Sequence, residues 1–165
     1  MRIAIAAALC VALAGCVTSE PPPPPGPPPG YNPEHDAHCR SLLMAPGSLV
    51  YVQCRLAMSQ TQRRAETAAR ALLTQNLGFV SPEADSALRD DIFCNYNESS
   101  KLSVEQVTPA DGALTAYGRC ATTRNRLQRQ IRSDHPMQAE AAIMAYDQSV
   151  IVTNEATITE ARTFH

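Results

Sequence analysis

Histidine and cysteine side chains gather at one point of this sequence. His35, His38 and Cys39 lie close together, and Cys54 follows them. Imidazole and thiolate ligands in such a set suit tetrahedral Zn²⁺. However, the cluster directly follows a proline-rich segment, and Cys54 offers Cys39 a disulfide partner, which would remove both thiolates. We therefore interpret the two histidines as solvated residues and expect neither a metal site nor another cofactor.

Residues suited to catalysis are scattered along the chain. There is no Gly-x-Ser-x-Gly nucleophile elbow and no glycine run that would cradle a phosphate. Asp90 and Asp91 are adjacent, and neighbours on a helix point about 100° apart. Glu98 lies in a polar stretch that we interpret as a surface loop, while His135 and His165 have no evident partner. We expect no enzymatic activity, and an unrecognised hydrolase is the less favoured alternative.

The charge balance argues against nucleic acid as a partner. The chain carries 14 basic and 16 acidic side chains, a formal net charge of −2, whereas nucleic-acid-binding domains are strongly basic. One stretch is locally basic and could hold phosphate groups. Its arginines spread around more than one helical face, so we favour a solvated helix. They are Arg119, Arg124, Arg126, Arg129 and Arg132.

The first sixteen residues have the pattern of an export signal. A basic start at Arg2 is followed by small and apolar residues from position 3 to position 14. This run is shorter than the roughly 20 residues that a transmembrane helix needs. It fits the apolar region of a signal peptide. The run ends in Leu-Ala-Gly-Cys, with the cysteine at Cys16.

Those four residues resemble the lipobox of bacterial lipoproteins, in which the cysteine is acylated and the chain is cut just before it. The resemblance implies that residues 1–15 are a signal peptide and that Cys16 carries a diacylglyceryl thioether and an N-linked acyl chain such as palmitate. Val17, rather than Asp, after the cysteine implies the outer membrane, with the domain in the periplasm. A secreted protein with a free Cys16 is the alternative.

The segment at positions 16–33 is predicted to be a linker. It contains most of the chain's 13 prolines, and proline fixes φ and donates no backbone hydrogen bond. Such a sequence adopts polyproline II and acts as a semi-rigid spacer. A ligand for a proline-recognition groove is the alternative, which we do not favour.

Four further cysteines predict two disulfides, since their number is even and the expected compartment is oxidising. Cys39 and Cys54 lie at equal distances from a Pro46-Gly47 turn. In an antiparallel helical hairpin these positions are level. A Cys39–Cys54 bridge would contribute about 3 kcal/mol of stability. Elimination then pairs Cys94 with Cys120.

The remaining sequence predicts helices throughout. Ser48, Ser81 and Thr108 precede helical patterns as N-caps, and Gly78 follows one as a stop signal. The long second helix is expected to bury a stripe that includes Val50, Ala68 and Leu72. The predicted helices are 34–44, 49–76, 81–94, 108–134 and 137–161, with a surface loop at 95–107.

The end of the last predicted helix is ambiguous by composition. Residues 149–153 and 157–159 are β-branched and would suit a strand, but no other strand is available to pair with them. We therefore expect an all-α fold in which residues 34–165 form a small helical bundle with two disulfides. In the fourth helix, Leu114, Tyr117, Leu127 and Ile131 are expected to face the core.

Positions 39–55 carry a second resemblance. Cys39, the Pro-Gly-Ser turn and the Tyr51-x-x-Cys54-Arg55 motif are similar to a pattern in small proteobacterial envelope lipoproteins and secreted proteins. It implies no activity. We expect a lipid-anchored envelope protein whose helical domain is a non-enzymatic binding or structural module for an envelope protein or the cell wall. The alternative is a periplasmic ligand-binding or inhibitor module, which an apolar pocket between helices would favour.

Overall fold

The computed structural model describes residues 32–163. The expected signal peptide, Cys16 and nearly all of the linker lie outside this range. Within it the chain forms six α-helices and no strand, which confirms the all-α prediction. None of these helices meets the length and hydropathy that a membrane span requires. The helices are α1 (Pro33–Ser41), α2 (Leu49–Leu77), α3 (Pro82–Leu102), α4 (Pro109–Arg119), α5 (Ala121–Asp134) and α6 (Ala139–Arg162).

Side-chain caps set the start of four helices. The side chains of Asn32, Ser48, Ser81 and Thr108 each accept a hydrogen bond from a backbone N–H in the first turn. Helices α1, α3 and α4 also begin with proline, whose fixed φ suits the first helical position. The predicted caps are therefore confirmed. Helix α1 starts at Pro33, which the sequence had placed in the linker.

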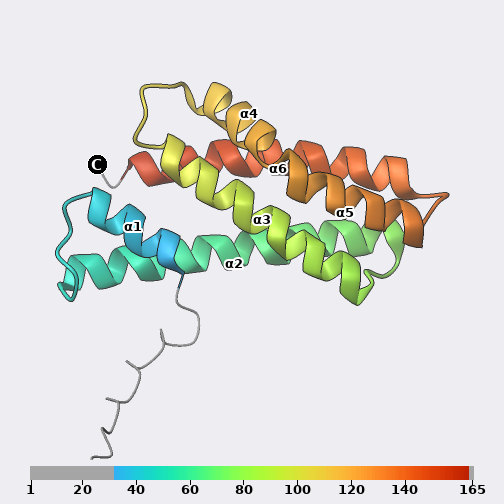
Figure 1. Ribbon diagram of the computed structural model, residues 1–165, viewed down its shortest axis with the longest axis horizontal. Coiled ribbons are helices and arrows are strands. Elements are labelled where there is room, and N and C mark those ends of the chain that lie inside the picture. The colour runs from blue at the N-terminus through green and yellow to red at the C-terminus, as the bar shows by residue number, and fades with distance from the viewer. Residues whose placement is uncertain (1–31, 164–165) are drawn as a thin grey trace, which may run out of the picture. The chain divides into compact units, whose positions relative to one another are not determined.

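The four longest helices, α2, α3, α5 and α6, form a bundle (Figure 1). Helix α6 packs against α2, α3 and α4, while α5 continues the line of α4 and packs along α3. Helix α1 folds back along the first half of α2, so that the two form a hairpin. The residues that stay buried in the main core include Leu73, Leu88, Leu127, Ile131, Ile143 and Tyr146.

Both disulfides pair as predicted. Cys39 is bonded to Cys54, with 6.1 Å between their Cα atoms, and Cys94 is bonded to Cys120, with 5.8 Å between theirs. The first bridge holds α1 against α2. The second ties α3 to the point where α4 gives way to α5.

The predicted surface loop at 95–107 is wrong, because α3 continues to Leu102. Its last two turns are rich in Asn and Ser, which have low helix propensity and suggested a loop. These side chains lie against other helices instead: Asn95, Asn97, Ser99 and Ser100 are all buried. Tertiary contacts thus override local preference.

Three smaller predictions also fail. The single helix expected at 108–134 is two helices, since the backbone leaves helical geometry at Cys120. The buried face of α2 is shifted by one residue from the expected stripe, so that Ala69 and Leu73 are buried while Ala68 is exposed. Leu114, expected in the core, is 56% exposed. Several faces of an alanine-rich helix are similarly apolar, so packing against the neighbouring helices decides which face is buried. By contrast, the β-branched end of the last helix is helical, as predicted.

The turn between α1 and α2 contains an unusual residue. Leu43 has a positive φ of 60° and a side chain that is 95% exposed. The left-handed region is unfavourable for residues other than glycine. Gly47, in the same turn, has a φ of 85°, and nothing lies within 4 Å of the position that a Cβ would take there. The backbone angle alone therefore sets the cost of a side chain at these two positions.

We predict that Leu43→Gly stabilises the protein by about 1 kcal/mol, because relief of the left-handed strain exceeds the entropy cost of glycine. No buried contact is lost, since the Leu43 side chain is exposed. Urea unfolding followed by circular dichroism measures the change. The matched variant Gly47→Ala should be less stable than the parent by about 1 kcal/mol. A destabilised Leu43→Gly would contradict this account of the turn.

Candidate ligand-binding cavity

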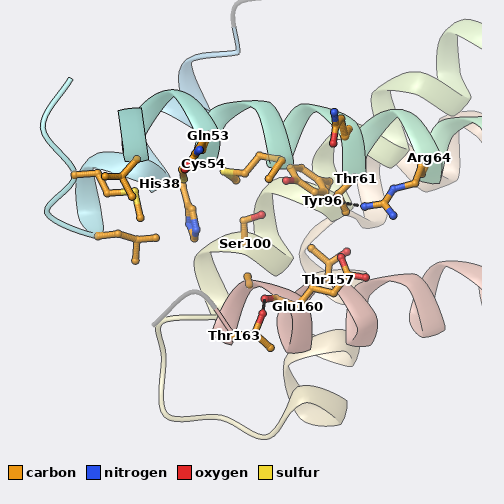
Figure 2. Close-up of a pocket in the computed structure, with 17 residues that line it drawn as sticks. His38, Gln53, Cys54, Thr61, Arg64, Tyr96, Ser100, Thr157, Glu160 and Thr163 are labelled. Atoms are coloured by element: carbon orange, nitrogen blue, oxygen red, sulfur yellow. Dashed lines mark hydrogen bonds between the residues drawn. The ribbon is translucent and has the colours of Figure 1, made fainter. Parts of the chain in front are cut away.

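A cavity of about 420 Å³ opens between the α1–α2 hairpin, the end of α3 and the end of α6. It lies beside the first half of α2, which contributes only Tyr51 to the buried residues, whereas the second half of that helix packs in the main core. Figure 2 shows Tyr96 and Ser100 from α3 between Thr61 on one side and Thr157 on the other. The volume of the cavity is in the range of small-molecule binding sites.

Most of the cavity wall is apolar. The α1–α2 turn and both long helices supply aliphatic and thioether side chains, and methionine adapts its shape readily to different ligands. The apolar lining residues are Leu42, Met44, Val50, Ala57, Met58 and Ala161. Such a wall favours a ligand that buries hydrocarbon.

The Cys39–Cys54 bridge and His35 hold α1 in place as part of the wall. His35 is buried, and its ring meets the Tyr96 ring edge-on, with 5.5 Å between the centroids. Burial, together with the positive charge of Arg55, lowers the pKa of His35 to about 4. His35 is therefore neutral at physiological pH and packs as an aromatic residue between α1 and α3.

The deep end of the cavity presents hydroxyl groups. Tyr96, Ser100 and Thr157 are buried and line it. Burial raises the pKa of Tyr96 well above its ordinary value, although a hydrogen bond with Ser100 opposes the shift. The phenol is therefore neutral and can donate a hydrogen bond, but it is not a base. Tyr96 and Thr157 also line a second, smaller cavity of about 10 Å³, which Asn154 borders.

Charged groups on the cavity wall are few. Arg64 on α2 and Glu160 on α6 both line it, and Figure 2 shows them on different helices. Arg64 donates a hydrogen bond to Thr61 Oγ1 at 3.1 Å and forms no ion pair within residues 32–163. A guanidinium group in this setting can bind an anionic head group of a ligand.

The polar atoms that remain unsatisfied lie elsewhere. His35 Nε2, Ser99 Oγ and His135 Nε2 are buried without a hydrogen-bond partner, and none of these residues lines the cavity. Polar groups around the cavity thus do not require a polar ligand to pair with them. Burial of apolar surface would supply most of the binding free energy.

The predicted histidine–cysteine cluster is divided between two roles. Cys39 and Cys54 are bonded to each other, His35 is buried against Tyr96, and His38 lines the cavity. The prediction that both histidines are solvated is wrong for His35. In the described part of the chain, no group of three or more His, Cys, Asp or Glu side chains is placed to hold a metal ion.

The other charged candidates form ion pairs on the surface. Glu98 is on α3 and not in a loop; it lies between Lys101 at 2.9 Å and Arg119 at 3.2 Å. These cations lower the pKa of Glu98 in spite of its partial burial, so it is an anion held between two cations. Arg126 pairs with Asp90 at 2.7 Å. Arg124, expected in solvent, is buried instead.

The Arg124 guanidinium group lies over the Tyr117 ring, 3.4 Å from its centroid. It also donates a hydrogen bond to the Tyr117 carbonyl oxygen at 2.5 Å. This cation–π contact and hydrogen bond occur where α4 meets α5, so they stabilise the junction of the two helices. The basic row on α4 and α5 therefore does not form one phosphate-binding surface.

A second polar cluster surrounds Asp91, which is fully buried in the bundle. Its Oδ2 accepts a hydrogen bond from the Tyr146 hydroxyl at 2.7 Å, and its Oδ1 lies 2.6 Å from Thr123 Oγ1. One turn further along, Asn154 donates to Asn95 Oδ1 at 3.0 Å. These contacts join α3, α5 and α6. The sequence contained no signal for them, because the partners are far apart in the chain.

Hydrogen counting indicates the protonation state of this carboxyl group. Thr123 has one hydroxyl hydrogen but two acceptors in range, Asp91 Oδ1 and the Cys120 carbonyl oxygen at 2.9 Å. A protonated Asp91 resolves this conflict, since it donates to Thr123, which in turn donates to Cys120. Burial raises the pKa of Asp91, while the hydrogen bonds from Thr123 and Tyr146 oppose the shift. The cluster is closed to solvent, so we assign it a structural role.

Comparison with known proteins adds no relative: the chain matches no protein-family model, no curated protein and no solved structure. Functional inference therefore rests on the cavity and on the residues around it.

We predict that Asp91→Asn gains stability relative to the parent as pH rises from about 4 to about 7. The folded-state pKa of Asp91 lies above its ordinary value of 3.8. In the parent, stability is therefore lost as pH rises through that folded pKa. Asparagine can donate to Thr123 and accept from Tyr146 without ionising. Urea unfolding at several pH values measures the free energy of unfolding of the variant and of the parent. His35 contributes equally to both proteins, so its contribution cancels in the difference.

Asp91→Ala is the control, because it removes both hydrogen bonds and leaves the Tyr146 hydroxyl buried without a partner. It should destabilise the protein by about 2–3 kcal/mol near pH 4. This deficit relative to the parent should shrink as pH rises, because alanine does not ionise and the parent loses stability. A constant difference between Asp91→Asn and the parent over this pH range would mean that the pKa of Asp91 is the same in the folded and unfolded chains, which would contradict the raised pKa.

Proposed function

We propose that this protein is a lipid-anchored, non-enzymatic binding module of the bacterial cell envelope, and that its ligand occupies the cavity between α2 and α6. The observation that supports the proposal is the cavity itself: its volume is about 420 Å³, and most of its wall surface is apolar. An apolar pocket between helices favours a ligand-binding module over a structural adaptor.

The chemistry of the wall supports an elongated apolar ligand with a small polar or anionic head. The aliphatic residues accept hydrocarbon, while the Tyr96 hydroxyl at the deep end and Arg64 on α2 offer donors. Tyr96 is held neutral by its raised pKa, so its phenol offers a hydrogen-bond donor and not a base. This combination is suited to binding and release without chemical change.

The amino-acid sequence supports the anchor. The Leu-Ala-Gly-Cys motif at the end of an apolar run resembles a lipobox, and Cys16 is the residue that would be acylated. The proline-rich segment that follows would be a semi-rigid spacer between the acyl chains and the helical domain. Two disulfides suit an oxidising compartment such as the periplasm.

We predict that the apolar fluorophore N-phenyl-1-naphthylamine binds the cavity, with increased and blue-shifted emission. Ala57→Phe and Ala161→Phe place an aromatic ring in the cavity and should each weaken binding at least about tenfold, because they remove the apolar volume that the probe fills. Fluorescence titration of the purified protein measures the affinity. A fatty acid should displace the probe.

The matched control is Ala68→Phe, which adds the same ring to an exposed position of α2 and should bind the probe as the parent does. Circular dichroism shows that each variant keeps its helical content. If Ala57→Phe and Ala161→Phe bind the probe as tightly as Ala68→Phe, the cavity is not the binding site.

We further predict that Cys16→Ser releases the protein from the membrane, because serine cannot form the thioether that holds the acyl chains. Fractionation of cells followed by immunoblotting measures the distribution. Cys10→Ser is the control: Cys10 lies in the expected signal peptide, so its replacement should leave the mature protein with the membrane. Membrane sedimentation of Cys16→Ser would contradict the lipid anchor.

A further inference from the structure

The turn between α1 and α2 is an exposed apolar surface. Leu43, Leu49 and Val50 are 95%, 72% and 58% exposed. We call Leu42, Leu43, Met44, Leu49 and Val50 the apolar tip. Positions 41–54 contain no Asp, Glu, Lys, Arg or His, and arginines stand at both borders of this run, at Arg40 and Arg55. Exposed aliphatic groups that form a contiguous patch mark a site of interaction.

Folding stability does not explain this composition. The Leu43 side chain is exposed, and its backbone adopts a left-handed conformation that leucine disfavours. A glycine or asparagine would suit that angle better. Strained residues that persist in a fold point to function. A leucine in such a position therefore indicates a surface that contacts something apolar.

The apolar tip is also one wall of the cavity. Leu42, Met44 and Val50 line the cavity, while Leu43 and Leu49 belong to the same turn and point into solvent. An apolar surface thus runs from the outside of the turn to the interior of the cavity. A partner that contacts the tip would meet the cavity at the same place.

The size and charge of the tip favour a lipid surface over a protein partner. It is a turn at one end of the bundle (Figure 1), and a few side chains on a turn cannot cover the roughly 800 Å² per partner that a stable protein interface buries. Insertion into a membrane interface needs only a small aliphatic surface. Arg40, which is exposed and also pairs with Asp36 at 2.9 Å, lies at the border of the tip, where anionic head groups would be.

We propose that the apolar tip inserts into the interfacial layer of a phospholipid membrane and that the cavity accepts a lipid acyl chain there. The inference rests on the proposed function and names its ligand class. Leu43 and Leu49 enter the acyl boundary, and the cavity wall formed by Leu42, Met44 and Val50 continues that apolar surface into the protein. The exposed Arg40 contacts lipid phosphates.

The absence of tryptophan from the chain allows a direct test with the full-length protein. Leu43→Trp and Phe79→Trp each place one reporter at an exposed turn; Phe79 is 61% exposed and follows the C-terminal end of α2. Helix α2 separates the two positions by roughly 40 Å at 1.5 Å per residue. Vesicles of phosphatidylethanolamine and phosphatidylglycerol, with and without brominated acyl chains, are added to both proteins.

The expected result is a blue shift of the emission of the Leu43→Trp protein and its quenching by at least half with brominated lipid, whereas the Phe79→Trp protein keeps its emission. Adding Leu49→Asp to the Leu43→Trp protein should abolish the quenching. Adding Val152→Asp, at a 63% exposed position of α6, should leave it unchanged. Equal quenching at both ends of α2, or unchanged emission of Leu43→Trp, would overturn the proposal.

The two proposals fail in different ways. Loss of tip insertion in Leu49→Asp with normal binding of N-phenyl-1-naphthylamine would separate the membrane contact from the cavity, as we expect. If the parent inserts its tip but does not bind the fluorophore, the cavity proposal is wrong and the tip is a membrane contact alone. If it binds the fluorophore but shows no insertion, the ligand reaches the cavity from solution.

Discussion

The buried hydrogen bond between Tyr146 and Asp91 is the contact on which the arrangement of the bundle depends. Many core positions are alanine, which packs closely but specifies little about which faces meet. A buried carboxyl group must find partners, and those within reach, Tyr146 and Thr123, lie on α6 and α5. Pairing them fixes α3, α5 and α6 in one register. The Asn95–Asn154 hydrogen bond repeats this constraint between α3 and α6.

This register also determines where the cavity lies. The second half of α2 packs into the core beside the Asp91 cluster, whereas its first half extends past it and meets α1. The Cys39–Cys54 bridge holds that hairpin closed, and His35 fills the space between α1 and Tyr96. The hairpin is thus rigid enough to form a wall without filling the space between α2 and α6. Small side chains face this space from both long helices, Ala57 on α2 and Ala161 on α6, and a cavity remains between them.

Membrane attachment and ligand binding are physically consistent in this protein. The lipobox resemblance predicts a domain tethered near a bilayer, and tethering raises the local concentration of any surface that binds that bilayer. An uncharged aliphatic turn would therefore need only weak affinity of its own to stay in contact. The same turn lines the cavity. The proposed anchor, tip and binding site would therefore all contact the lipids of one membrane.

The sequence by itself determined the local features of this protein. Helix starts follow from short-range caps and prolines, such as Ser48 and Pro82, and the disulfide pairs follow from the equal distances of Cys39 and Cys54 from a turn. Only the tertiary structure decided which residues are buried. The helical end of α3, the Asp91 cluster and the cavity arise from contacts between side chains tens of residues apart. Such contacts override weak local propensities, and no short pattern in the sequence encodes them.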